Sequence, residues 1–342
     1  MKLSMAAVES VFQHQETLDT FDDTLNTNHI SNYRHCLALL QCKPPREKCY
    51  FGECGQCPPK EEFLDLLDKV FDRKGLDEIE FRQWVTTDRS TLEYKKLTAE
   101  DFIPYFHEQL TDLLQHDFIA KAQSSFLQEK KQELSEGEFV IVGDFSENYS
   151  FIVQDAAQSF HWNNCQASLH PFVVYYRKNN ELQHLSFVAI SDCNQHDVIA
   201  VHLFQTRLIN FLKSSHKITK IFYFSDGCAA QYKNRKNFIN LCYHKNDFDI
   251  EAEWHFFATS HGKGPCDGIG GTVKRLAART SLQRTGVNAE PILDPKALFS
   301  FAVKALPSII FTFTTSEEHE AHRQKLMKRF DNARTIPGNL VT

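Results

Sequence analysis

The sequence predicts a mixed α/β protein in which a sheet domain follows a helical region and a small cysteine-rich segment. Three observations lead to this: short apolar strands alternate with helices after Gly137, apolar residues recur at helical spacing before it, and cysteines concentrate near the start of the chain. Strands in hairpin order followed by helix, strand, helix and strand are typical of a mixed sheet. The expected segments are residues 1–60, 61–137 and 138–342.

The predicted sheet contains five strands. They are Glu138–Phe145, Phe172–Tyr176, Leu185–Ile190, Lys220–Phe224 and Ala252–Phe257, with a turn at Asn179-Asn180 between the second and third. Helices are expected over 203–212, 229–241 and 270–278, and the pattern over 61–136 also reads as helical. The remainder of the chain after this sheet is expected to form a helical extension.

Composition excludes several classes of protein. The chain has 342 residues, 42% of them apolar and 24% charged, which is ordinary for a globular protein and unlike collagen-like, disordered or disulfide-scaffold chains. The longest apolar runs, such as Ile309–Phe313, are far shorter than the ~20 residues of a membrane-spanning helix. The first residues have no apolar run of the kind that a secretory signal needs. We therefore expect an intracellular, reducing location and no membrane partner.

Charge is unevenly spread along the chain. Between Arg207 and Arg284 there are 13 Lys and Arg against 6 Asp and Glu, a local charge of +7 in a chain whose net charge is −6. Separate basic and acidic blocks indicate one surface for a polyanion and another that does not touch it. The alternative is chance clustering on a solvated face.

Half of the ten cysteines lie between Cys36 and Cys57. In a reducing compartment such a cluster indicates a metal site rather than disulfides. The C-x-x-C turn of Cys54 and Cys57 lets two thiolates converge on one ion, and two further thiolates would close a structural zinc site. The expected ligands are Cys42, Cys49, Cys54 and Cys57, with Cys36 or His35 as substitutes. Buried thiols without metal are the alternative.

Three aspartates form the second candidate site. Asp144 and Asp226 each follow an apolar strand, and the carboxyl ends of strands in α/β sheets open onto the crevice where ligands bind. Asp267 is the one acidic residue between Glu253 and Glu290, and it stands at the start of a helix. Three oxygen ligands without a nearby Cys or His cluster favour Mg²⁺ or Mn²⁺ over zinc. A pair of such ions can cleave a phosphodiester.

The stretches around these aspartates resemble a known family. They are Gly143-Asp144-Phe145-Ser146-Glu147-Asn148-Tyr149, Ser225-Asp226-Gly227-Cys228-Ala229-Ala230-Gln231-Tyr232-Lys233-Asn234 and His261-Gly262-Lys263-Gly264-Pro265-Cys266-Asp267-Gly268. They are similar to the three blocks of eukaryotic DDE/D cut-and-paste DNA transposases and transposon-derived proteins, over roughly residues 138–290. The order of the elements agrees, with acids after the first strand, after the fourth and at the helix following the fifth.

The resemblance implies a ribonuclease-H-like fold in which Asp144, Asp226 and Asp267 are the catalytic triad and hold two Mg²⁺ or Mn²⁺ ions. It also implies DNA cleavage and strand transfer, DNA as the partner (transposon ends or target) and a nuclear location, and it is compatible with a homo-oligomer. Many relatives carry Glu where this chain has Asp267. The family also has an amino-terminal DNA-binding module, which no stretch before Cys36 resembles, so we expect a truncated or partly decayed copy.

Polar and basic side chains around these blocks are candidate nucleic-acid ligands, because binding a duplex requires phosphate neutralisation. They are Gln231, Lys233, Asn234, Arg235, Lys236, His261, Lys263, Lys274 and Arg275. We expect Gln231 and Asn234 on one helix face (i, i+3), and His161-Trp162 either stacks on a base or lies in the core. The alternatives are ordinary: an aspartate caps a helix or forms a turn, and His261 is a loop residue. Glu147 rivals Asp144.

Three functions follow from these observations. The first is a metal-dependent nuclease and strand transferase of the transposase class. The second is a ribonuclease or exonuclease on the same fold, disfavoured because the first strand lacks an Asp-x-Glu. The third is a domesticated or decayed descendant that binds DNA or protein without catalysis. Hydrolase, P-loop and dinucleotide motifs are absent from the sequence.

Overall fold

The computed structural model describes residues 32–86, 90–152, 165–257, 264–283 and 292–333, and the chain divides into two compact units, residues 1–122 and 123–342. Within the described ranges, no helix combines the length and the apolar character that crossing a membrane requires.

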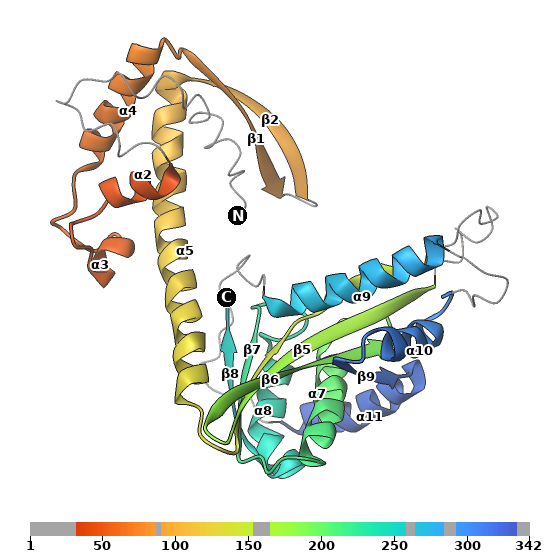
Figure 1. Ribbon diagram of the computed structural model, residues 1–342. Helices are drawn as coiled ribbons and strands as arrows, with labels where there is room; N and C mark the ends of the chain where they lie inside the picture. Colours follow the sequence, from red (N-terminus) through yellow and green to blue (C-terminus); the bar gives the residue numbers. More distant parts are fainter. Residues whose placement is uncertain (1–31, 87–89, 153–164, 258–263, 284–291, 334–342) are drawn as a thin grey trace. The chain divides into compact units, whose positions relative to one another are not determined.

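The first unit contains short helices, a hairpin and the start of a long helix (Figure 1). Its elements are α2 (Tyr33–Leu39), α3 (Glu47–Tyr50), α4 (Lys60–Lys74), β1 (Glu78–Thr86), β2 (Ser90–Thr98) and α5 (Ala99–Glu133), the last of which continues past residue 122. Helix α4 begins directly after Pro58-Pro59 and ends at Gly75, whose φ of 62° suits a residue without a side chain. The core of the first unit is formed by phenylalanine and leucine side chains from α4 and α5, together with Ile79 and Phe81 of β1.

The second unit is a seven-stranded mixed sheet with helices on both faces. Its elements are β3 (Glu138–Gly143), β4 (Ser146–Ser150), β5 (Gln166–Lys178), β6 (Glu181–Ser191), α7 (Val198–Lys213), β7 (Lys220–Ser225), α8 (Arg235–Phe248), β8 (Glu251–Phe256), α9 (Pro265–Leu282), α10 (Pro295–Ala305), β9 (Ile309–Thr314) and α11 (Ser316–Asn332). The strand order is β8-β7-β3-β5-β6-β9, with β4 paired to β5. Strand β5 runs antiparallel to β3 and β6, whereas β7 and β8 run parallel to β3.

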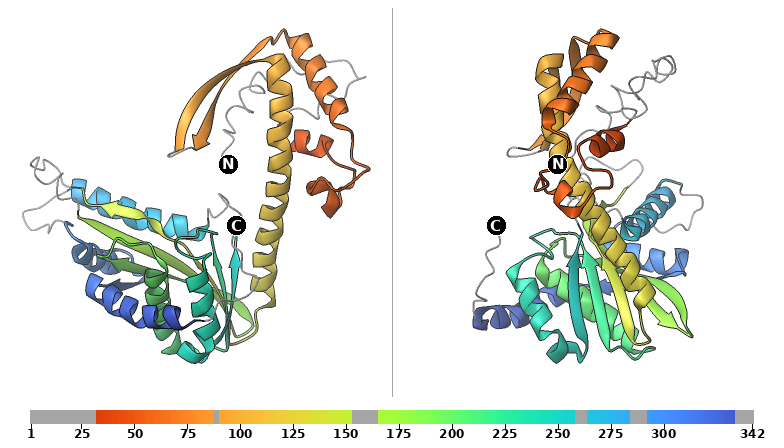
Figure 2. Two further views of the ribbon diagram at one scale, coloured as in Figure 1. Left: turned by 180° about the vertical axis from the view of Figure 1, so that it is seen from behind. Right: turned by 90° about the vertical axis from the view of Figure 1, so that its left-hand side faces the viewer.

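Alternate residues of the strands face opposite helical layers. Phe139 and Ile141 of β3 pack with α7, and Val140 and Val142 lie on the other face near the start of α9. Figure 2 shows α9 and α10 on one side of the sheet and α7, α8 and α11 on the other. Because both faces are covered, the central strands are apolar on both sides, which explains the uninterrupted apolar run Phe139–Val142.

The structure confirms a mixed α/β sheet and the turn at Asn179 and Asn180, both of which have positive φ. Two predictions of helix were wrong. Residues 78–98 form the hairpin of β1 and β2, because alternate residues of β1 such as Ile79 and Phe81 face the core. The expected helical extension after the sheet contains β9, which pairs with β6. With β4, this raises the strand count from the expected five to seven.

Two glycines of α9 make the packing of this helix testable. A side chain at Gly270 would meet Ser146 Oγ at 2.6 Å, whereas nothing lies within 4 Å of a side chain at Gly268. We expect Gly270→Ala to destabilise the protein by about 1–3 kcal/mol through overpacking. Gly268→Ala should stabilise it by up to ~1 kcal/mol, because alanine is the better helix former. Melting temperatures measure both, and equal values for the two variants would contradict the close approach of α9 to β4.

Candidate functional sites

Four cysteines of the first unit converge on one point. The sulfur atoms of Cys42, Cys49, Cys54 and Cys57 all lie within 4.8 Å of one another. The Sγ of Cys42 is 3.8 Å from that of Cys54 and 3.9 Å from that of Cys57. A tetrahedral ion with Zn–S bonds of ~2.3 Å requires sulfurs ~3.8 Å apart. The cysteine cluster therefore has the geometry of a four-thiolate metal site.

Local backbone structure creates this cluster. Cys49 lies in the single turn of α3, and its sulfur accepts a hydrogen bond from the backbone N–H of Arg46 at 3.3 Å. That bond lowers the pKa of Cys49 to about 7, which favours the thiolate that a metal needs. Cys36 is fully buried in the apolar core, and burial raises the pKa of its thiol to about 12. The structure thus leaves Cys36 outside the cluster.

The second site forms where β3 and β7 end. These strands pair in parallel with Val142 opposite Phe224, so Asp144 and Asp226 each lie two residues beyond that pair, at one edge of the sheet. Asp144 is held through its backbone N–H, which donates to the carbonyl oxygen of Pro171 at 3.3 Å. The Asp226 carboxylate accepts the backbone N–H of Cys228 at 3.0 Å, so it also forms a turn.

The third aspartate reaches this edge through α9. Asp267 is exposed in the first turn of that helix, next to the buried Cys266. The Cys266 sulfur donates to the carbonyl oxygen of Val142 at 3.4 Å, which ties the start of α9 to the end of β3. Among the described residues, the four cysteines are the one group of three or more potential ligands that converges in this way, and the three carboxylates do not form such a group.

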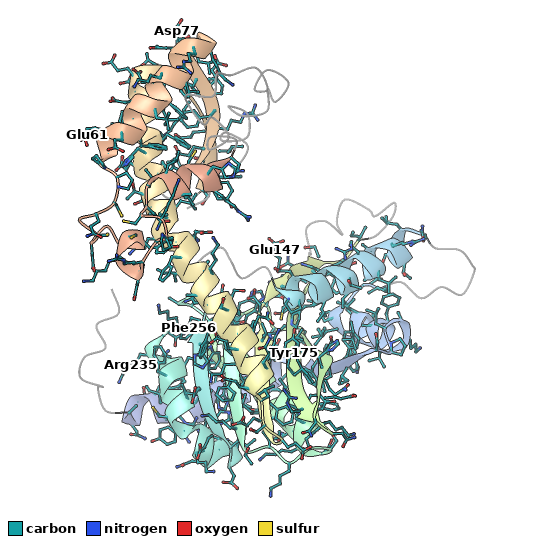
Figure 3. The ribbon with its side chains drawn as sticks, turned by 60° about the vertical axis from the view of Figure 1, so that its left-hand side comes forward. Glu61, Asp77, Glu147, Tyr175, Arg235 and Phe256 are labelled. Carbon is teal, nitrogen blue, oxygen red and sulfur yellow. The ribbon has the colours of Figure 1, made fainter. Side chains whose placement is uncertain are left out.

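The carboxylates nevertheless act on one another. Partial burial, followed by the charges of Asp226 and Asp267, raises the pKa of Asp144 to about 7. A carboxylate in this setting favours either a proton or a cation. Glu147, the predicted rival, is exposed on β4 and is not among the causes of that shift. Figure 3 labels Glu147 near the start of α9.

Sequence reasoning missed a buried polar pair behind Asp144. His170 of β5 and Tyr232 are fully buried, and the His170 Nε2 lies 2.8 Å from the Tyr232 hydroxyl. Burial lowers the pKa of His170 to about 3, so the imidazole is neutral. A side chain at Gly143 would meet the Phe172 ring at 2.8 Å, which explains the glycine before Asp144. Tyr232 lies within the second block, and the one sequence signal that it is buried is an aromatic residue between the polar residues Gln231 and Lys233.

Basic side chains on α9 lie beside the carboxylate edge. Lys274 donates to the carbonyl oxygen of Glu147 at 3.1 Å, which holds α9 against β4. Arg275 is exposed and donates to the Thr272 hydroxyl at 3.3 Å. Both cations therefore have a structural partner, and neither pairs with a carboxylate among the described residues.

The basic side chains after Asp226 contact aromatic rings and a carbonyl oxygen of the protein itself. Lys233 and Lys236 place Nζ over phenylalanine rings at 5.9 and 5.6 Å. Arg235 donates to the carbonyl oxygen of Ala333 at 3.1 Å. All three side chains are exposed.

The helix predicted over 229–241 was placed too early. Helix α8 begins at Arg235, and the Asn234 side chain caps it by accepting the N–H of Asn237. Before it, the chain forms tight turns closed on the carbonyl oxygen of Cys228. Gln231 is half-buried in these turns, so the prediction that Gln231 and Asn234 share a helix face was wrong. The cap preference of asparagine outweighed helical spacing.

Several predicted residues lie outside the described ranges. They are His161, Trp162, His261, Gly262 and Lys263. The third block is thus described from Gly264 onward.

Comparison with known proteins gives family membership without a function. Residues 123–340 match the family described as a domain of unknown function (DUF8701), and residues 10–114 match the one described as a domain of unknown function (DUF8700). No curated protein matches the chain.

The cysteine cluster predicts metal content. Purified wild-type protein should carry about one zinc per chain, and Cys54→Ser should lose it because three thiolates hold the ion weakly. Cys242→Ser is the matched control, since Cys242 is exposed on α8 of the other unit. Elemental analysis after purification with a reductant and zinc measures this. Wild-type protein without zinc would contradict the site.

The raised pKa of Asp144 predicts a stability that falls as pH rises. An unfolded aspartate has a pKa of ~3.9, so protonated Asp144 stabilises the fold fully below about pH 4, and this stabilisation is lost as pH rises through about 7. Without added Mg²⁺ or Mn²⁺, Asp144→Asn should match wild type near pH 4 and exceed it by about 1–3 kcal/mol at pH 8. Melting curves across this range, with Glu147→Gln as the control, test it. Parallel profiles for wild type and Asp144→Asn would contradict it.

Proposed function

The chain belongs to the DUF8701 family, and from the geometry of its carboxylates we propose that it is a transposase-like, metal-dependent enzyme that cleaves and joins DNA. One observation carries the proposal. The parallel register of β3 and β7 puts Asp144 and Asp226 at the same level of one sheet edge, and the Cys266 bond to Val142 brings the first turn of α9, with Asp267, to that edge.

The sheet topology supports a ribonuclease-H-like identity for this unit. Five neighbouring strands of the sheet have the order β6-β5-β3-β7-β8, in which the first three form antiparallel pairs and the last two are parallel to β3. This is the arrangement that the resemblance implies. Strands β4 and β9 are additions that leave the carboxylate edge in place.

The three carboxylates have the chemistry to hold divalent cations. Asp144, Asp226 and Asp267 supply hard oxygen ligands, and their mutual repulsion is relieved when a cation lies between them. Bound Mg²⁺ or Mn²⁺ would supply activation of the attacking water or 3′-hydroxyl and stabilisation of the leaving oxygen. The strands fix Asp144 and Asp226 in advance, and the turn at Cys228 limits the rotation of Asp226.

We assign the cysteine cluster to a structural zinc ion. Four thiolates fill the tetrahedral positions, so none remains for a substrate or water. The neighbouring chain has few regular elements, with a four-residue helix between two stretches of turn and loop. A bound metal ion would stabilise the fold of such a segment, which a large apolar core would otherwise do.

Nucleic acid fits the charges beside the carboxylate edge. Arg275 is exposed on α9 and adjoins Lys274, and Arg279 is exposed in the last turn of the same helix. Cations of this kind position a phosphate backbone without reading its sequence. A DNA substrate would place the enzyme in the nucleus.

A second function, DNA binding without cleavage, is favoured by one observation. Asp267 is exposed, and the three carboxylates are not a converging group of potential metal ligands as the four cysteines are. A descendant that had lost catalysis would retain the fold and the basic surface. Both functions predict DNA binding, and they differ in cleavage.

The substitution Asp226→Asn separates these functions. Asparagine keeps the acceptor for the Cys228 N–H, so the melting temperature should stay near that of wild type. Mn²⁺-dependent nicking of supercoiled plasmid should fall to the level without enzyme, because one metal ligand loses its charge. Glu147→Gln removes the same charge from β4 and should nick at the wild-type rate.

Two outcomes would count against catalysis by these residues. Nicking by Asp226→Asn at the wild-type rate would exclude the carboxylate site. Wild-type protein that binds DNA but does not nick it in Mn²⁺ or Mg²⁺ would favour binding without cleavage.

A further inference from the structure

A pocket opens at the sheet edge that carries the aspartates. It has a volume of about 400 Å³ and lies between the first turns of α7 and α8 and the side of α11. Its lining includes Asp197, Ala230, Arg235, Lys236 and Arg323. All of these residues belong to the second unit.

Topology places this pocket beside the carboxylates. Strand β6 is parallel to β3, because each pairs antiparallel with β5. Helix α7 follows β6 and α8 follows β7, so both helices begin at the edge where Asp144 and Asp226 lie. The loop after Asp226 supplies Ala229 and Ala230 to the wall of the pocket. One short loop thus connects the two sites.

The pocket has an excess of positive charge. Its one carboxylate, Asp197, already accepts the N–H groups of Ile199 and Ala200 and pairs with His319 and Arg323. The remaining two cations, Arg235 and Lys236, have no carboxylate partner among the residues that the structure describes.

Side-chain cations, rather than helix ends, would hold an anion in this pocket. The first N–H groups of α7 are satisfied by Asp197, and Asn234 caps α8. Arg235 contacts the carbonyl oxygen of Ala333, and Lys236 lies over the Phe330 ring, so both side chains are anchored along α11. Because anchored side chains are already partly ordered, they lose less conformational entropy when a ligand binds. Figure 3 labels Arg235 at the start of α8.

We propose that this pocket binds a backbone phosphate of the same DNA whose scissile bond lies at Asp144, Asp226 and Asp267. The proposal rests on the proposed function. Contacts to phosphate oxygens fix the register of a nucleic acid on a protein, and a polyanion is the ligand that an excess of cations favours. The pocket lies on the α7, α8 and α11 side of the sheet, so it would hold the strand on the far side of the Asp226 loop from α9.

The test measures binding, not cleavage. A fluorescein-labelled 20-base-pair DNA duplex is titrated with full-length protein in Ca²⁺ at several salt concentrations, and anisotropy gives the affinity. The double variant Arg235→Gln/Lys236→Gln should bind about tenfold more weakly, and its salt slope should be smaller by about 1–2, since each phosphate contact contributes ~0.9. Lys245→Gln, in the last turn of the same helix and paired with Asp249, should behave as wild type.

The outcomes separate this pocket from the proposed function. Arg235→Gln/Lys236→Gln could keep the wild-type affinity and salt slope while Lys274→Gln/Arg275→Gln binds more weakly with a smaller slope. DNA would then bind at α9 and not in the pocket. That result overturns the proposal for the pocket and leaves the proposed function standing. If wild type does not bind the duplex at all, both are overturned. A merely structural role for the two cations would lower the melting temperature without changing the slope, which also overturns the pocket.

A further arm distinguishes a small anion from a polynucleotide. Inorganic phosphate is added to wild type and to the double variant, and melting temperatures are compared. A rise in wild type alone, together with an unchanged slope on the duplex, would identify a site for a free anion and overturn the DNA proposal. A lower slope in the double variant supports it.

Discussion

Backbone hydrogen bonds between the parallel strands β3 and β7 fix Val142 opposite Phe224, and the position of every group at the carboxylate edge depends on that register. A slip of one residue would turn alternate side chains to the wrong face and separate Asp144 from Asp226. The pairing is protected because both faces are covered, by α7 on one side and by α9 with the end of α5 on the other. The central strands cannot shift without exposing these two apolar layers.

Burial behind the edge determines its electrostatics. His170 and Tyr232 fill the space between β5 and the Asp226 loop, and both are closed to solvent. Because a neutral imidazole and a phenol carry no positive charge, this buried pair does not neutralise the negative charge of the neighbouring carboxylates. The charge of Asp144 is therefore balanced from the solvent side, by a proton or by a cation. This asymmetry favours a ligand that approaches from outside the sheet.

Much of this arrangement was predictable from the sequence, for identifiable reasons. The strands around Phe139–Val142 and Lys220–Phe224 are continuous apolar runs, and such runs predict buried strands. The four cysteines were predictable because a C-x-x-C turn is a local feature. The hairpin of β1 and β2 was missed, since Ile79 and Phe81 face a core formed by distant helices, and a two-residue alternation is easily read as helical when helices flank it.

Contacts between distant residues were beyond prediction. The His170–Tyr232 pair joins residues 62 apart, and the bond from Cys266 to Val142 spans 124. Local patterns report the state of one segment, whereas these contacts depend on how the sheet orders its strands. The start of α8 was misplaced for a different reason, because the N-cap at Asn234 competes with helical spacing and makes the helix begin six residues after the predicted start.

The two candidate metal sites differ in how far the protein alone organises them. Among the cysteines, sulfur separations of 3.8 and 3.9 Å already match the edge of a zinc tetrahedron. Among the aspartates, the backbone is fixed but the carboxylates do not converge as the four sulfurs do. Thiols repel one another little when protonated, whereas ionised carboxylates separate until a cation draws them together. A site of the first kind suits a permanent structural ion, and one of the second kind suits ions that arrive with a polyanionic substrate. Arg235 and Lys236, which have no carboxylate partner among the described residues, lie at the same edge and fit that second case, because cations attract a polyanion and repel a metal ion.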